Sequence, residues 1–424
     1  MKRYLKVLPI LAYLFLMPGL ALAGEVLTWH DCVAEAAKNH PDLIAAVEEI
    51  KQSESAKKIT ASTLFPQVTG SVSASTAKTA SQTSGSSTGN TYGYGVTGTQ
   101  LIFDGNKTVN DVKAASQNIA ASKQNYRFTS VTVRYRLRSA FISLLKAQEM
   151  LQITNDIFNI RRENLELISL RYESGLEHKG ALLTAEADLA QAKYLISQAK
   201  RDVEVARREL TKEMGRDKMV ELAAKGEFVV NDSAKDEPDF ESLAKNNPSL
   251  QQLIAQKNSA EFSLKSVYAN FSPTLSGQAG ANRTGSHWEP RGDQWNLGAT
   301  ISLPIFEGGL RLAQVSQAKA LLNQLKENER STKDSVVLTL QQTWALLQDA
   351  IENVSVQKKS LEANEERSKI AQAQYSIGLI DFNNWTIIED NLVQAKRTYL
   401  DAQANALFAE AGWIQAKGET IEYE

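Results

Sequence analysis

The sequence predicts a mainly α-helical chain that also carries a β-barrel part, and three observations support this class. Paired motifs recur at offsets of 203 to 207 residues, which indicates a duplicated unit. Apolar residues repeat every seven positions over two stretches of about 68 residues, as in long coiled-coil helices. Before each stretch, apolar and polar residues alternate with a period of two, as in β-strands. Apolar content is average, 42% of 424 residues, so residue order rather than composition carries this prediction.

Residues 1–23 are predicted to be a secretory signal peptide. Lys2, Arg3 and Lys6 form its basic start, an apolar run follows, and Ala21-Leu22-Ala23 supplies the small residues of a cleavage site. An N-terminal membrane anchor is the alternative, but the apolar run is shorter than the roughly 20 residues of a spanning helix. We therefore expect an exported protein, and no later stretch is apolar enough to predict a transmembrane helix.

The rest of the chain is predicted to contain one unit twice. Each motif occurs once in each half, in the same order. The offset between the halves changes from 207 to 203 at one place, where the first repeat is longer than the second. We therefore expect a first repeat at 24–213, an equatorial linker segment at 214–240 and a second repeat at 241–424. The pairs are Asn39-His40-Pro41-Asp42-Leu43 with Asn246-Asn247-Pro248-Ser249-Leu250, Pro66 with Pro273, Phe103-Asp104-Gly105 with Phe306-Glu307-Gly308, Tyr172-x-x-Gly175-Leu176 with Tyr375-x-x-Gly378-Leu379, and Gln191-Ala192-Lys193 with Gln394-Ala395-Lys396.

Each repeat is predicted to run as helix, β-hairpin, very long helix, turn and long helix. In the first repeat we expect a helix from about Thr28 to Thr60 and then a hairpin over 65–103. Its loop is expected at Thr76 to Asn90, which is rich in Ser, Thr and Gly. A flexible interdomain linker is the alternative for that segment, but its position between two strand patterns favours the loop. The second hairpin is expected over 272–306, with its loop at 282–293.

After each hairpin, apolar a and d positions of a heptad predict an uninterrupted helix, roughly 100 Å long. Gly175 and Gly378 are expected to end these helices, because glycine readily adopts the left-handed backbone of a helix end. New helices are expected from about Leu182 to Thr211 and from about Trp385 to Ala416, and a short strand at Phe228–Val230. The heptad positions are Val133, Ala140 and Ala147 with Leu137, Leu144, Leu151, Phe158, Leu165 and Tyr172, and Val336, Thr343 and Ala350 with Leu340, Leu347, Val354 and Leu361.

Strands of about ten residues with alternating faces match the tilted spans of an outer-membrane sheet. In lipid such a sheet has to close, because an open edge leaves backbone groups unpaired. Four strands cannot close and an open channel needs about twelve, so three chains are expected to share one transmembrane barrel. The charged long helices are then expected to form a coiled-coil tube in the periplasm. The residues expected to face lipid are Tyr92, Tyr94, Trp295, Leu297 and Ile301, and those expected to face a wet interior are Ser71, Ser73, Thr97, Thr300 and Ser302.

The sequence gives little support for catalysis. One cysteine, Cys32, and four scattered histidines predict no metal site, and Cys32 is expected to be a small apolar residue on a helix face. The segment Gly93–Gly98 fits the dinucleotide spacing but lies within a strand, and Gly85–Gly89 fits a nucleophile motif but lies in a low-complexity loop. We therefore expect no enzyme activity and no cofactor. Because 47 basic residues balance 49 acidic ones, nucleic acid is not an expected partner.

Together the segment Leu303–Gly309, the paired Asn-x-Pro-x-Leu motifs and the long repeat resemble the TolC-like outer-membrane efflux protein family over essentially the whole mature chain. The resemblance implies a homotrimer with a twelve-stranded barrel, a periplasmic α-barrel and an equatorial belt near Phe228. It also implies partners, namely a periplasmic adaptor protein and an inner-membrane pump of the RND or ABC type, besides the lipid of a Gram-negative outer membrane.

The resemblance also implies two kinds of site. Adaptor docking is carried over to the two helix turns, at Gly175, Leu176, Gly378 and Leu379. The acidic rings that narrow the pore in the family fall on Asn384 and Ile387, so they are missing. Asp381, Asn383 and Asn384 are the candidates for a polar constriction, whereas Glu389 and Asp390 are expected on a solvated face.

The expected function is that of a passive exit duct that carries drugs, toxic compounds or metals and is energised by its partners. An outer-membrane component of type I protein secretion is the alternative. A soluble periplasmic coiled-coil adaptor is less favoured, because the alternation in Trp295–Ile305 has no use there. The substrate and the pump are not written in the sequence.

Overall fold

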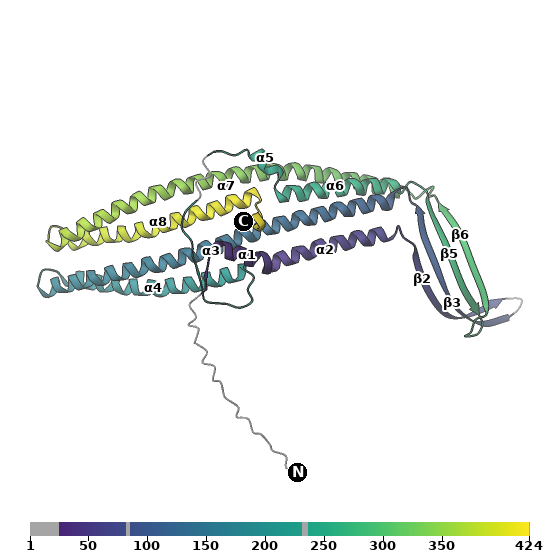
Figure 1. The fold of residues 1–424 in the computed structure, drawn as a ribbon, viewed down its shortest axis with the longest axis horizontal. Coiled ribbons are helices and arrows are strands. Elements are labelled where there is room, and N and C mark those ends of the chain that lie inside the picture. Colours follow the sequence, from purple (N-terminus) through teal and green to yellow (C-terminus); the bar gives the residue numbers. More distant parts are fainter. Residues whose placement is uncertain (1–24, 82–84, 231–235, 424) are drawn as a thin grey trace, which may run out of the picture.

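The computed structural model describes residues 25–81, 85–230 and 236–423, so the predicted signal peptide lies outside the described part. The elements follow the predicted order twice, and Figure 1 shows their arrangement. They are β1 (Glu25–Leu27), α1 (Trp29–Asn39), α2 (Pro41–Ser62), β2 (Gln67–Ser81), β3 (Gly85–Phe103), α3 (Lys107–Glu173), α4 (Lys179–Glu213), β4 (Leu222–Ala224), α5 (Phe240–Lys245), α6 (Pro248–Ala269), β5 (Thr274–Gly285), β6 (Gly292–Ser302), α7 (Leu310–Ser376), α8 (Phe382–Lys417) and the 3-10 turn η2 (Ile421–Tyr423).

The molecule is elongated, with α3 and α7 running along the whole helical part, the sheet at one end and two helix turns at the other (Figure 1). Both long helices have 67 residues, which confirms the heptad prediction. On the sheet side of the middle, α3 packs against α2 and α6, and on the far side against α4 and α8; α7 packs against α6 and α8. Within the described ranges, no helix combines the length and apolarity that crossing a membrane requires.

The single helix predicted from Thr28 to Thr60 is wrong, because two helices meet at His40. His40 has an extended backbone, φ −67° and ψ 123°, and its ring Nδ1 accepts the backbone N–H of Asp42 at 3.1 Å, which caps α2. Pro41 occupies the first position of α2, where its missing N–H costs nothing. The Asn-x-Pro-x-Leu motif is therefore a helix boundary, and Asn247 caps α6 in the same way in the second repeat.

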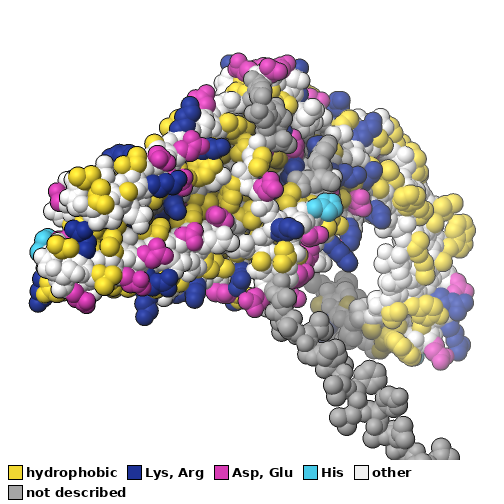
Figure 2. Space-filling model, turned by 60° about the vertical axis from the view of Figure 1, so that its left-hand side comes forward, with side chains coloured by type: hydrophobic (Ala, Val, Ile, Leu, Met, Phe, Trp, Pro, Cys, Tyr) yellow, Lys and Arg dark blue, Asp and Glu magenta, His cyan; other side chains and the backbone are white. Residues whose placement is uncertain are grey.

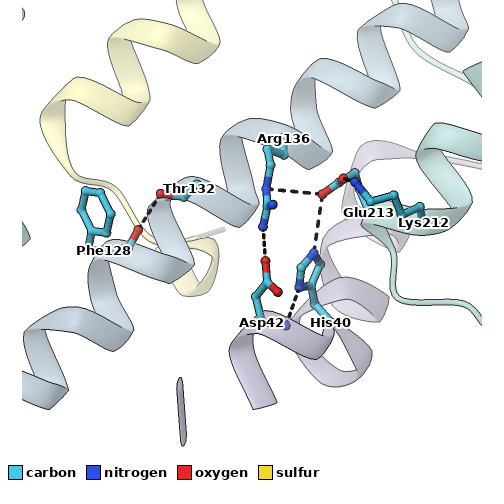
Figure 3. A network of polar contacts seen from close by, with 7 residues as sticks. All are labelled: His40, Asp42, Phe128, Thr132, Arg136, Lys212 and Glu213. Atoms are coloured by element: carbon cyan, nitrogen blue, oxygen red, sulfur yellow. Dashed lines mark hydrogen bonds and ion pairs between the residues drawn. The ribbon is translucent and has the colours of Figure 1, made fainter. Parts of the chain in front are cut away.

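A polar network ties this helix break to two neighbouring helices (Figure 3). Buried Glu213, at the end of α4, places its Oε2 3.5 Å from His40 Nε2 and 3.6 Å from Arg136 Nε on α3. Arg136 also donates to the carboxylate of Asp42, and Lys212 Nζ lies 2.8 Å from the other oxygen of Glu213. The network therefore fixes α2, α3 and α4 relative to one another in the middle of the molecule.

Asp42→Asn is expected to lower the thermal stability near neutral pH and to have a smaller effect in acid. Hydrogen bonding from Arg136 lowers the pKa of the Asp42 carboxyl below its usual 3.8. A lowered folded pKa means that the stabilisation is present above 3.8 and is lost as the pH falls through the folded value. Because both partners are partly exposed, the effect should stay below about 1 kcal/mol. Melting temperatures near pH 7 and pH 3 test this, with exposed Asp202→Asn as the control; equal losses at both pH values would contradict it.

Heptad residues of α3 form the core at the same level. Leu137 and Leu144 are completely buried and pack with Leu210 of α4 and with Cys32 of α1. Cys32 is completely buried on one face of α1, which confirms the prediction of a small apolar residue on a helix face, and this burial raises the pKa of its thiol to about 12. In the second repeat the heptad residue Leu340 is equally buried, in a separate cluster with α5 and α8.

The four long strands form one antiparallel sheet with the order β2-β3-β5-β6. The loop predicted at Thr76–Asn90 is too long, because β2 continues to Ser81 and β3 begins at Gly85. In the second hairpin the strand predicted to reach Ile305 ends at Ser302, close to Pro304, which has no N–H to donate.

The short strand predicted at Phe228–Val230 is also wrong. The strand of this segment is β4, Leu222–Ala224, which pairs in parallel with β1 at the start of the described chain. Phe228 instead packs its ring beside the buried helix residues of two clusters. An aromatic residue followed by two β-branched valines is typical of a strand. Here Phe228 packs against helices instead of pairing in a sheet.

Candidate channel surfaces

The sheet has one apolar and one polar face, in register across all four strands. Val72 of β2 pairs with Tyr94 of β3. Two residues further along the strands, Ala281 of β5 lies between Val96 of β3 and Trp295 of β6. Because side chains alternate along a strand, the five residues predicted to face lipid all lie on this one face. Trp295, Leu297 and Ile301 are 82%, 78% and 71% exposed, and Figure 2 shows apolar side chains gathered over the sheet.

The opposite face carries the residues predicted for a wet interior. The residues that share it are Ser71, Ser73, Thr97, Thr300 and Ser302. The Gly93–Gly98 motif belongs to β3 and opens no helix. A Cβ at Gly95 would lie 2.7 Å from the Cβ of Asn282, so close strand packing explains this glycine. Gly85–Gly89 likewise lies at the start of β3 rather than at a strand-to-helix turn.

The two helix turns at the far end have the same geometry. Gly175 and Gly378 adopt φ of +74° and +82°, as predicted for residues that end helices. In each turn the next residue donates its N–H to a carbonyl five residues back: Leu176 to Arg171 at 2.8 Å, and Leu379 to Gln374 at 2.9 Å. The side chains of Leu176 and Leu379 are 67% and 69% exposed. The four residues predicted for docking therefore form two matching apolar tips.

The residues predicted for a pore constriction begin α8. Asp381 caps this helix, with its carboxylate accepting the backbone N–H of Asn384 at 2.7 Å and the side-chain amide of Asn384 at 2.9 Å. Asn383 and Asn384 are exposed, and so is Ile387 one turn further on. Asp381 thus has a structural role in the single chain, and all three polar residues are exposed at the start of α8.

The solvated face predicted for Glu389 and Asp390 is wrong for Glu389, whereas the side chain of Asp390 is 60% exposed, as predicted. Glu389 is 4% exposed and accepts the hydroxyl of Ser368 at 2.5 Å, and Asp390 pairs with Arg161 of α3. The guanidinium of Arg161, itself buried, also lies 3.7 Å from Asp188 of α4. Arg161 therefore joins α3, α4 and α8. This cluster was missed, although Arg161 falls two heptads after Ala147 in the apolar seam, where a charge calls for a partner.

An aromatic layer joins the two helical hairpins closer to the tips. Tyr375 of α7 stacks on Trp385 of α8 with ring centroids 4.4 Å apart. Its hydroxyl donates to Glu177 at 2.8 Å, and the Arg171 guanidinium lies 4.7 Å from its ring centre. Burial, reinforced by the bond to Glu177, raises the pKa of the Tyr375 hydroxyl, so it remains a donor. The α3–α4 hairpin therefore contacts the α7–α8 hairpin near the two turns.

An apolar sheet face next to very long, charged helices defines a membrane-embedded β-sheet protein with a large helical part outside the bilayer. The model of the outer membrane efflux protein family matches residues 32–216 and 240–419. The chain belongs to the outer membrane efflux protein family and is an outer-membrane protein.

Relatives and solved structures agree with this assignment. The chain is 24% identical over 413 residues to the outer membrane efflux protein BepC of Brucella suis, covering 96% of this chain and 85% of that protein. It is 27% identical over 231 residues to the alkaline protease secretion protein AprF of Pseudomonas aeruginosa, covering 52% and 47%. The fold matches the CmeC outer membrane channel of Campylobacter jejuni with a TM-score of 0.79 at 19% identity, covering 92% and 85%. These relatives are efflux, secretion and channel proteins rather than enzymes.

Proposed function

We propose that three copies of the chain form a passive exit duct in the outer membrane, which carries small molecules such as drugs, toxic compounds or metals out of the periplasm. The observation that carries the proposal is the four-stranded sheet with one apolar face and two unpaired edges, β2 and β6. In a bilayer both edges need partners, and edge pairing between copies supplies them. The polar face then lines the lumen, and the long helices continue it as a tube.

The internal repeat gives the register of pairing between copies. The residue numbers of β2 and β3 become those of β5 and β6 when 207 and 203 are added to them. The pair Gln67–Thr99 of the first hairpin then becomes Thr274–Ser302, which is the pair observed in the second hairpin. The same offsets convert β3 into β6 and β5 into β2. The pairing of β3 with β5 inside the chain therefore predicts pairing of β6 with β2 of the next copy. The pair Thr97–Gly280 thus becomes Thr300 opposite Ser73 of the next copy.

A Thr300→Cys and Ser73→Cys double variant is therefore expected to cross-link between copies. Opposed Cα atoms in an antiparallel pair lie about 4.5–5.5 Å apart, within the range of a disulfide. Oxidation of outer membranes should give covalent trimers on denaturing gels. The matched control is Thr300→Cys with Val72→Cys, which points to the other face and should not cross-link. Trimers that form without this cross-link would refute the register, and failure to form trimers would refute the assembly.

The partners belong to the same proposal. A periplasmic adaptor is proposed to dock on the tips at Gly175, Leu176, Gly378 and Leu379, and an inner-membrane pump of the RND or ABC type supplies the energy. Two exposed leucines in matching turns support docking of a repeated apolar partner, because desolvated apolar anchors dominate protein interfaces. Asp381, Asn383 and Asn384 are proposed to narrow the duct near this end, where their exposed polar groups support such a role.

Type I protein secretion is the second candidate function, and the similarity to AprF favours it. A deletion strain separates the two candidates. Raised sensitivity to small toxic compounds with normal protein export supports the efflux duct, and the reverse pattern supports secretion. Normal behaviour in both assays would refute both functions. The less favoured soluble adaptor has no use for the exposed apolar face of the sheet.

A further inference from the structure

The loop end of the sheet carries a cavity that the duct does not use. It has a volume of about 660 Å³ and is lined by Tyr92, Tyr94, Arg283, Trp288, Glu289 and Arg291. Tyr94 and Arg283 are paired across β3 and β5 on the apolar face. The next pair on the same face, one step nearer the helices, is Ala281 of β5 with Trp295 of β6. The cavity therefore lies on the apolar face of the sheet. Figure 1 shows that the β5–β6 loop, which supplies part of its wall, is at the end of the sheet far from the helices.

Three aromatic rings give the cavity an amphipathic wall. Tyr92 and Trp288 meet edge to face, with centroids 5.9 Å apart and an interplanar angle of 87°. Trp288 is 69% exposed although it belongs to this pair. Tyrosine and tryptophan prefer the level of the lipid headgroups, because their rings are apolar and their tips polar. Such a wall accommodates the upper part of an acyl chain below a polar headgroup.

Two arginines line the cavity. The carboxylate of Asp293 accepts hydrogen bonds from two nitrogens of Arg283, Nε and, at 3.4 Å, Nη2. The third nitrogen, Nη1, lies 3.5 Å from the hydroxyl of Tyr94. Within the described part of the chain, no carboxylate forms an ion pair with Arg291. Asp293 already neutralises Arg283, so Arg291 is the guanidinium of the wall that is left to bind an anion, beside the carboxylate of Glu289. Guanidinium groups bind phosphate through paired hydrogen bonds.

We propose that this cavity binds a phosphorylated glycolipid of the outer leaflet, with its phosphate on Arg291 and its upper acyl chain against Tyr92 and Trp288. The inference rests on the proposed membrane assembly, which puts this face in lipid. Bound lipid would hold the β5–β6 loop against β3 and anchor the barrel at a fixed depth.

Native mass spectrometry of the detergent-purified full-length assembly tests the site. The probes are lipid A, a bis-phosphorylated acylated disaccharide, and the same lipid without its phosphates. Lipid A is expected to bind about tenfold or more tightly than its dephosphorylated form, because charge-assisted hydrogen bonds add affinity. Arg291→Gln should remove this preference. Trp288→Ala should weaken both lipids alike, and Arg162→Gln on α3 should change neither.

Channel conductance in planar bilayers is measured on the same samples. Conducting assemblies of wild type and Arg291→Gln that bind both lipids equally would overturn the lipid site and leave the duct intact. Wild-type protein that neither assembles nor conducts would overturn the duct. Loss of the preference in Arg162→Gln as well would show a general charge effect and would also overturn the site.

Discussion

Leu297→Arg is expected to remove the protein from the outer membrane, whereas Asn296→Arg is expected to leave it there. Leu297 is the central residue of β6 and points out from the apolar face. An arginine in that position near the middle of the bilayer costs about 2–4 kcal/mol, and the proposed trimer would carry the cost three times. Asn296 points to the opposite, polar face, which the proposed assembly turns toward a wet lumen that accepts a charge.

The comparison uses outer-membrane fractions, with the trimer assessed by its resistance to unheated detergent. We expect loss of the Leu297→Arg trimer together with the same sensitivity to toxic compounds as in a deletion strain. Normal amounts of a Leu297→Arg trimer would contradict the lipid-facing assignment. Loss of the Asn296→Arg trimer alone would mean that the two faces are reversed.

Most of the fold could be predicted because it rests on periodic patterns. Seven-residue spacing fixed the two long helices to within a few residues, and Gly175 and Gly378 marked the turns because a left-handed backbone favours glycine. Two-residue alternation identified which side chains share a face of the sheet. The helix break at Pro41 was missed because the apolar pattern continues across it, although a proline at a first helical position is itself a boundary signal.

Contacts between distant segments could not be predicted in the same way. Glu389 and Arg161 are far apart in the sequence, and the position of Arg161 in the apolar seam indicates that it needs a partner without saying which residue that partner is. The cavity at Arg291 depends on the β5–β6 loop lying against Tyr92 of β3, and no spacing in the sequence encodes that approach. The network around Glu213 likewise joins residues of three helices. Periodicity specifies which face of an element is buried, but it does not specify the partner.

Arg161→Met is expected to loosen the tip end of the helical part and to make the duct leaky. The guanidinium of Arg161 lies between Asp188 of α4 and Asp390 of α8, and its side chain is 10% exposed. Burial raises the pKa of Asp188, although Arg161 opposes this effect. Removing the guanidinium leaves the carboxylates of Asp188 and Asp390 without their shared cation. Breaking a fully buried pair costs about 3–5 kcal/mol, and the partial exposure of both aspartates should reduce that cost.

Arg162→Met provides the matched control, because it removes the same charge one residue further along α3, from an exposed side chain. We expect a lower melting temperature and entry of a large antibiotic only for Arg161→Met. Adding Asp390→Asn should restore part of the stability, since it removes one of the carboxylates that the substitution left behind. If Arg161→Met loses stability but stays closed, the aromatic layer at Tyr375 and Trp385 is sufficient to hold the hairpins together. If both arginine variants leak equally, the closed state depends on the net charge of α3 and not on the contact of Arg161 with α4 and α8.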